Sequence, residues 1–260
     1  MSGNDNEKQF SRRDFLKTTG VFTGGIIGGS LLGGVVMDQT NLLDDEETAT
    51  SNETTGSDSG AEDGNMAART FFSRSEDFET LAAATERIYP EDDNGPGAIA
   101  LGVPYFIDRQ MSGFYGQNSQ DYTMGPFKPM ASDTHGLQAK LIRGDIFLFG
   151  LRRLDEVSNE KHDKAFPDLD GAAQDDILKS FEAGDVDIKG VTSEFFFNLL
   201  RNMTIEGVYS DPAYGGNKDM QGWKMIEYPG PRMGWINEIE SKEFQSLEPE
   251  ALRQYQGGGI

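Results

Sequence analysis

Three carboxylates in the second half of the chain are the first residues whose types and spacing could support chemistry. Glu206, Asp211 and Asp219 lie close together in the sequence. A pair of carboxylic groups held in different protonation states can act as general acid and general base, as a hydrolase requires. The alternative is that they are solvated or ion-paired. This second interpretation is favoured, because the chain holds 44 Asp and Glu residues against 23 Lys and Arg.

A glycine-rich run, Gly215-Gly216-Asn217, lies between these carboxylates. Glycine backbones can aim N–H groups at an anion, so one hypothesis is a phosphate cradle. The run lacks the Lys-Ser/Thr ending of a P-loop and the strand–turn–helix setting of a dinucleotide site. The competing interpretation is a tight turn that needs positive φ angles. We favour a structured turn within a loop that faces a partner protein.

The residues that usually carry redox and metal chemistry are scarce. The chain has no cysteine and two histidines, His135 and His162. This excludes disulfides, thiol catalysis, cysteine-ligated iron–sulfur clusters and c-type haem attachment. A histidine-based metal site is not expected either. We expect His135 to lie at the surface or to cap a helix, and His162 to face solvent. The sequence therefore predicts no cofactor on this chain.

The charge balance narrows the class of partner. The formal net charge of the 260 residues is -21. A nucleic-acid-binding protein needs a cationic surface to displace counterions, so no nucleic acid is expected. Docking on an anionic membrane surface is disfavoured for the same reason. The acid excess runs through the whole chain, which favours a surface suited to high salt, as in a haloarchaeal protein, over an acidic binding tail.

The N-terminal residues have the layout of a twin-arginine export signal. Arg12 and Arg13 are followed by Phe15 and Leu16, and then by a glycine-rich apolar stretch from Val21 to Met37. This order is typical of signals for export in the folded state. No A-x-A cleavage site follows closely, which leaves retention as an N-terminal anchor open. We therefore expect an exported protein, at the outer face of the cytoplasmic membrane or the cell surface.

The chain divides into four regions on composition. Residues 1–37 are the predicted signal, and residues 38–69 are a polar, acidic segment that lacks enough large apolar residues to fold. Such a segment is expected to be a disordered linker. Residues 70–235 hold the folded domain, and residues 236–260 are a polar tail with a short helix expected over 248–255.

Apolar residues at helical spacing predict an all-α domain with long ordered loops. One helix is expected from a Ser75 cap to Pro90, and a short one from Pro104 through Met111. A long helix is expected from Thr134 to Val157. Two more begin at the caps Asp170 and Thr192, and the first of these ends at Gly184. The aromatic residues Trp223, Tyr214, Tyr228 and Phe127 lie in loops rich in Gly and Pro, where they either fill the core or anchor an interface.

The most specific motifs after Thr192 are Tyr214-Gly215-Gly216-Asn217, Gly222-Trp223-Lys224 and Tyr228-Pro229-Gly230. These motifs resemble those of the gluconate 2-dehydrogenase subunit 3 family, the small subunits of flavin-dependent sugar and sugar-acid dehydrogenases. The N-terminal half is also similar, through Ile88-Tyr89-Pro90, Gly102-Val103-Pro104 and Gly125-Pro126-Phe127. The resemblance covers about residues 70–230.

The resemblance implies a subunit without its own active site. A large flavoprotein subunit would hold FAD and oxidise the substrate, and a cytochrome could accept the electrons. This chain would escort that subunit through the twin-arginine translocase and stay bound to it. The residues that it implies for the partner interface are Tyr214, Gly215, Gly216, Asn217, Trp223, Lys224, Tyr228, Pro229 and Gly230.

Two other hypotheses remain open at this point. The chain could be a stand-alone exported hydrolase that uses the carboxylates near residues 206–219. It could also be a surface-tethered binding protein. The scarcity of histidine and the lack of cysteine weaken the first, and the resemblance weakens the second.

Overall fold

The computed structural model describes residues 68–121, 125–128, 138–236 and 239–256. The predicted export signal, the acidic linker up to residue 67, and His135 lie outside the described residues. Within them the chain is mostly helical, as predicted, with one small hairpin of two strands, β1 (Asp187–Ile188) and β2 (Val191–Thr192). No helix among the described residues has the length and apolar character needed to cross a membrane.

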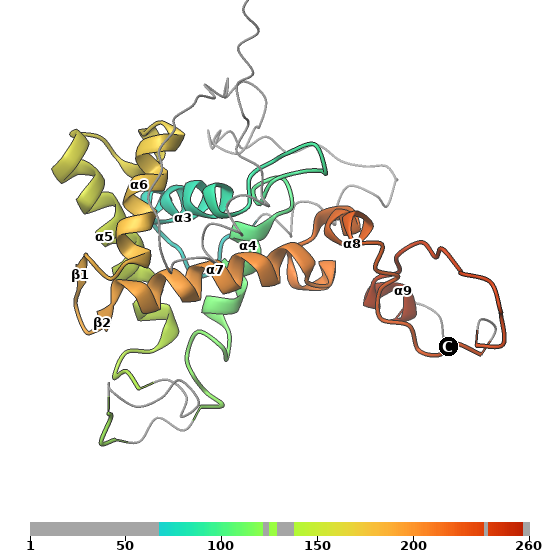
Figure 1. Ribbon diagram of the computed structural model, residues 1–260. Coiled ribbons are helices and arrows are strands. Elements are labelled where there is room, and N and C mark those ends of the chain that lie inside the picture. The colour runs from blue at the N-terminus through green and yellow to red at the C-terminus, as the bar shows by residue number, and fades with distance from the viewer. Residues whose placement is uncertain (1–67, 122–124, 129–137, 237–238, 257–260) are drawn as a thin grey trace, which may run out of the picture.

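The body of the fold is a bundle of helices around one apolar core (Figure 1). Its main helices are α3 (Ser75–Ile88), α4 (Val103–Ser112), α5 (Arg143–His162), α6 (Gly171–Glu182) and α7 (Ser193–Tyr209). Helix α7 packs against α4 and α6, and α3 packs against α5. Three aromatic rings at the centre of the core pack edge-to-face. The centroid of the Phe196 ring lies 6.1 Å from that of Phe147 and 6.0 Å from that of Phe181.

Two helix starts agree with the capping residues expected from the sequence. The Asp170 side chain accepts a hydrogen bond from the Ala173 backbone N–H, at 2.9 Å. The Thr192 hydroxyl accepts one from Phe195 N–H, at 3.2 Å. The expected cap at Ser75 is wrong by one position, since Ser75 is the first helical residue and Arg74 precedes it with an extended backbone.

The long helix is displaced from its predicted bounds. It was expected over Thr134–Val157, but α5 begins at Arg143 and continues to His162. The Arg143 backbone N–H donates to the side-chain oxygen of Asn118, at 2.9 Å. This acceptor lies 25 residues earlier in the chain. Because the capping group comes from another loop, the local periodicity could not show where the helix begins.

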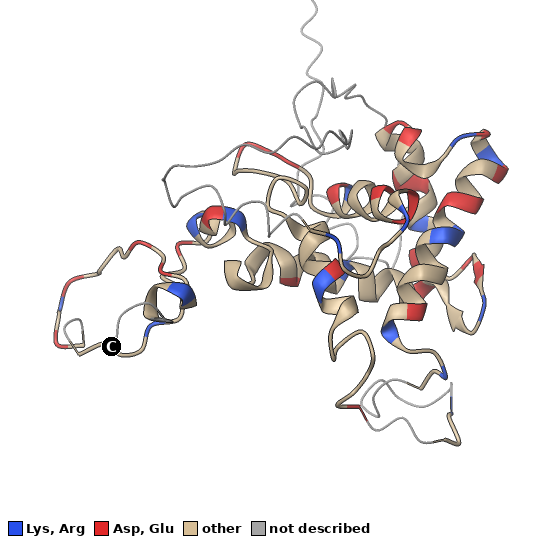
Figure 2. Cartoon of the chain, turned by 180° about the vertical axis from the view of Figure 1, so that it is seen from behind, with Lys and Arg blue, Asp and Glu red and all other residues tan. Residues whose placement is uncertain are grey.

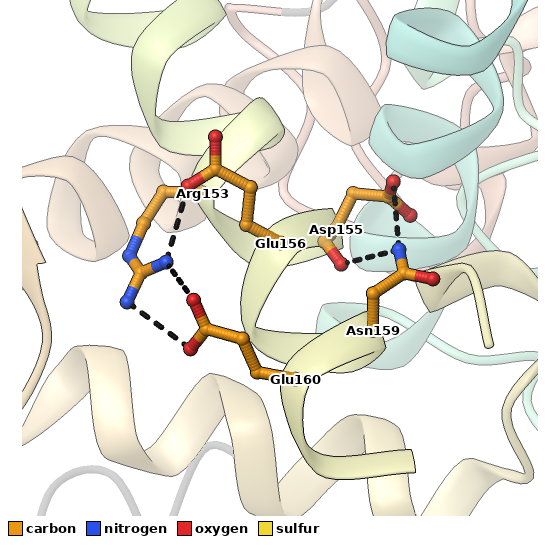
Figure 3. Close-up of polar contacts among 5 residues, drawn as sticks. All are labelled: Arg153, Asp155, Glu156, Asn159 and Glu160. Atoms are coloured by element: carbon orange, nitrogen blue, oxygen red, sulfur yellow. Dashed lines mark hydrogen bonds and ion pairs between the residues drawn. The ribbon is translucent and has the colours of Figure 1, made fainter. Parts of the chain in front are cut away.

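Polar side chains form ion pairs and hydrogen bonds along the last turns of α5 (Figure 3). Arg153 reaches Glu156 at 3.1 Å and Glu160 at 2.8 Å, so one guanidinium holds two carboxylates on the same helix face. Asn159 donates to the backbone oxygen of Asp155, at 2.9 Å. These contacts are exposed to solvent, so each adds little to the stability of the fold. Figure 2 shows charged residues on several helices of the bundle.

The start of the described chain is fixed to α4 by one buried carboxylate. Asp108 has no exposed surface. Its two oxygens accept hydrogen bonds from the backbone N–H groups of Thr70 (2.6 Å), Phe71 (3.0 Å) and Phe72 (2.8 Å). The Thr70 hydroxyl adds a fourth, at 2.8 Å. This contact joins the residues that follow the predicted linker to the interior of the helical body.

Candidate functional site

The segment after α7 folds back onto the end of that helix. It contains two short 3-10 helices, η3 (Pro212–Tyr214) and η4 (Lys218–Met220), and the one-turn helix α8 (Gln221–Met225). We call residues 211–230 the fold-back segment. It holds every residue that the resemblance places at a partner interface.

Asp211 begins the fold-back segment as a structural cap. It is 8% exposed, and its carboxylate accepts hydrogen bonds from the backbone N–H groups of Ala213 (2.9 Å) and Leu252 (2.8 Å). The first bond caps η3, and the second holds the start of α9 (Leu252–Gln256). Both carboxylate oxygens are therefore engaged by the backbone.

Asn217 organises the centre of the segment. It is fully buried and has a left-handed backbone, with φ 49°. Its amide nitrogen donates to the Ser210 carbonyl at 2.8 Å, and its amide oxygen accepts from Gly222 N–H at 2.7 Å. Asparagine tolerates this conformation better than most residues, because its short amide can bond to nearby backbone. The Asn217 side chain thus makes hydrogen bonds to backbone groups that would otherwise be made within a helix or a strand.

Two glycines let the segment lie directly on the backbone of α7. A Cβ at Gly216 would sit 2.2 Å from the Gly207 carbonyl oxygen. A Cβ at Gly222 would sit 2.1 Å from that of Val208. Neither distance is possible for a real side chain, so glycine is required by close approach. With the φ of 99° at Gly215, the structured-turn interpretation of this run is confirmed.

The fold-back segment contains several non-glycine residues with a strained, left-handed backbone. Among the described residues, Asn217, Asp219, Met220 and Glu227 are non-glycine residues with φ between 49° and 55°. Each such residue costs on the order of 1–3 kcal/mol, and strain of this kind gathers at sites of function. The segment is therefore a stronger candidate for a functional surface than the regular helices.

The predicted interface residues divide into supporting and exposed groups. Trp223 is 3% exposed, its indole N–H donates to the Tyr209 carbonyl at 2.8 Å, and its ring meets Tyr228 edge-to-face at 5.3 Å. Trp223 therefore belongs to the chain's own packing. The buried members are Gly215, Gly216, Asn217, Trp223 and Gly230, whereas Tyr214, Lys224 and Tyr228 are exposed and Pro229 is half-buried.

Trp223→Phe is expected to destabilise the fold by about 1–3 kcal/mol, because the Tyr209 carbonyl loses its donor and the smaller ring leaves space. Denaturant unfolding followed by circular dichroism measures this. Trp235→Phe is the matched control, since Trp235 is 43% exposed, and its unfolding free energy should change by less than about 0.5 kcal/mol. Equal changes in the two variants would mean that Trp223 is not a packing residue.

A shallow groove of about 570 Å³ lies beside the fold-back segment. It is lined by Phe106 and Gln110 of α4, Ile205, Glu206 and Tyr209 of α7, and Tyr214. Partial burial raises the pKa of Glu206, and the positive charge of Arg143 opposes that rise. The groove residues of α4 were not predicted as functional. One feature of the sequence could have indicated this groove. Gln110 is a polar residue that lies four positions after Phe106, on a helix face that is otherwise apolar.

The three candidate acid–base carboxylates are only partly brought together. Glu206 and Asp211 line the same groove, but the carboxylate of Asp211 serves as a cap. Asp219 is exposed on η4 and is not among the groove residues. His162 is exposed, as expected. Within the described ranges, no group of three or more His, Asp or Glu side chains is arranged to hold a metal ion.

The helical body and the fold-back segment together match one known protein family. Residues 75–230 match the model of the family described as gluconate 2-dehydrogenase subunit 3. The matched range begins with α3 and ends at the last residue of the fold-back segment. No curated protein and no solved structure matches the chain.

Proposed function

Because the chain belongs to the gluconate 2-dehydrogenase subunit 3 family, we propose that it is the non-catalytic small subunit of an exported, flavin-dependent dehydrogenase of gluconate or a related sugar. The observation that carries the proposal is the family match, which spans the helical body and the whole fold-back segment. Membership of this family implies a dehydrogenase partner and hence a hetero-oligomer. We propose that the partner holds FAD and that a cytochrome accepts the electrons.

The fold-back segment is the proposed contact with the partner. Its exposed side chains include the rings of Tyr214 (51% exposed) and Tyr228 (42%) and the Lys224 ammonium. Tyrosine is enriched at interfaces because it combines a large apolar ring with a polar tip. The buried Asn217 and Trp223 would hold these side chains in place rather than touch the partner.

The proposed function is tested by affinity purification of the tagged chain from its native host, in the salt of that host. A large dehydrogenase subunit with the absorbance of a flavin should be recovered with it. Recovery of the chain alone, without flavin or dehydrogenase activity, would contradict the proposal and return the alternatives of a stand-alone enzyme or a tethered binding protein.

The export role gives a separate prediction. We propose that the chain carries its folded partner through the twin-arginine translocase and remains with it at the outer face of the membrane. Arg12→Lys/Arg13→Lys should lower the exported dehydrogenase activity at least tenfold and leave both subunits in the cytoplasm, because the translocase would no longer bind the leader. Cell fractionation with an activity assay measures this.

Arg74→Lys is the control for this experiment, because Arg74 lies outside the leader and its side chain is 55% exposed. This variant should export normally. If the dehydrogenase subunit is still exported in the Arg12→Lys/Arg13→Lys strain, the escort role is wrong even where the two subunits form a complex.

A further inference from the structure

The residues after the fold-back segment form an arm that is closed at its base. We define the C-terminal arm as residues 231–236 and 239–250. It contains no helix or strand and extends beyond α8, away from α5 and α6 (Figure 1). The family match ends at residue 230, so it does not cover the arm. Long loops without secondary structure inside an ordered protein are commonly functional.

The base of the arm is fixed by contacts between its two ends. The Glu250 backbone N–H donates to the Pro229 carbonyl at 3.2 Å. Arg232 pairs with the Glu250 carboxylate at 3.3 Å and donates to the Glu248 carbonyl at 2.8 Å. Just beyond the arm, Leu252 N–H is held by Asp211, as described above. The arm is therefore attached to the fold-back segment at both ends.

The outer part of the arm exposes large apolar side chains. Among the described residues, the most exposed of these outside the arm is Phe114, at 75%. The arm contributes Met233 (75%), Trp235 (43%), Ile236 (87%), Ile239 (77%) and Phe244 (89%). Exposed side chains of this size, gathered in one segment, mark an interaction surface.

The local charge supports the same conclusion. Between Tyr214 and Phe244 the sequence has four basic and five acidic residues, although the net charge of the whole chain is -21. The acid excess is interrupted along the fold-back segment, whereas residues 231–250 have two basic and five acidic residues. The arm therefore combines exposed apolar side chains with negative charge, which suits a partner surface that is apolar and has a positive rim.

We propose that the C-terminal arm inserts Trp235, Ile236 and Phe244 into an apolar groove of the dehydrogenase subunit, next to the contact made by the fold-back segment. This inference rests on the proposed function and names the part of the chain that secures the partner. The acidic residues Glu240 and Glu243 lie beside the apolar ones in the sequence, so the rim of that groove carries positive charge.

Two other occupants fit the arm less well. Loops that insert into a lipid surface usually bring basic residues toward the anionic headgroups, whereas this arm brings Glu240 and Glu243. A second copy of the chain would bring together two molecules that each carry a net charge of -21. The dehydrogenase subunit is the partner already implied by the family.

The test uses the tagged full-length chain with Trp235→Ser/Ile236→Ser/Phe244→Ser, purified from the native host in native salt. The amount of dehydrogenase subunit recovered per chain should fall at least tenfold, because apolar anchors dominate interface energies. The melting temperature of the chain should stay within a few degrees, since the three side chains are exposed. Phe114→Ser is the matched control and should recover the partner normally.

A second variant, Glu240→Lys/Glu243→Lys, tests the charge of the groove and should also lower recovery. If the serine variant recovers the partner within twofold of the unmodified chain, the arm inference is wrong while the proposed function stands. If the unmodified chain recovers no dehydrogenase, the proposed function itself fails. If the unmodified chain floats with vesicles and the serine variant does not, the arm binds lipid and the inference is overturned. If the unmodified chain self-associates and the serine variant does not, the arm binds a second copy and the inference is likewise overturned.

Discussion

Asp108→Ala is expected to destabilise the helical body by roughly 3–5 kcal/mol, the largest loss from a single substitution among those considered. The substitution removes the acceptor of three backbone N–H groups, those of Thr70, Phe71 and Phe72. Asp108 and Phe72 are fully buried, so water cannot readily replace the bond between them, whereas Thr70 is exposed. Each buried donor left without a partner costs about 1–3 kcal/mol. Denaturant unfolding followed by circular dichroism gives the free energy.

Asp176→Ala is the matched control for this experiment. Asp176 is also an aspartate on a helix, but its side chain is 79% exposed and its partner Lys179 lies at 3.5 Å. Its loss should change the unfolding free energy by less than about 0.5 kcal/mol. Asp108→Asn keeps one acceptor oxygen and should fall between the two. A value for Asp108→Ala close to that of Asp176→Ala would show that the clamp adds nothing to stability.

Gly216→Ala is expected to cost about 3 kcal/mol in stability and to lower recovery of the dehydrogenase partner at least tenfold. The added methyl group would lie 2.2 Å from the Gly207 carbonyl oxygen, so the fold-back segment must move away from α7. Because η3 ends two residues before this contact and η4 and α8 follow it, the exposed Tyr214 and Tyr228 would be displaced with it. Unfolding measurements and affinity purification report the two effects.

Gly234→Ala separates close approach from any general effect of replacing glycine. The nearest heavy atom to a Cβ at Gly234 is a side-chain carbon of Ile236 at 4.0 Å, an ordinary contact. This variant should retain its stability within about 0.5 kcal/mol. If Gly216→Ala is equally stable, the contact between the fold-back segment and α7 is looser than the structure indicates.

Features that depend on neighbouring residues were predicted well. The caps Asp170 and Thr192 lie within three residues of the N–H groups that they accept, and both are confirmed. The turn at Gly215–Asn217 followed from glycine and asparagine alone. These interactions are local, so the sequence contains both partners side by side.

Features that depend on distant residues were not predictable in the same way. The start of α5 is set by Asn118, and the burial of Trp223 by the Tyr209 carbonyl on α7. Most of the arm falls in the predicted polar tail, residues 236–260, because Ile239 and Phe244 are scattered among charged residues. The composition of a segment does not show whether its apolar side chains are buried. Their exposure depends on whether the rest of the fold packs against them.

The closed base of the C-terminal arm has a consequence for the kinetics of assembly. Because Arg232, Glu248 and Glu250 already join its two ends, less backbone freedom is lost when the partner arrives than would be lost by an open tail. Ordering of the arm would then slow association less than it would for an open tail. The apolar side chains at its outer end would act mainly on how slowly the subunits separate. Under the proposed export role, a complex that dissociates slowly would suit two proteins that cross a membrane together.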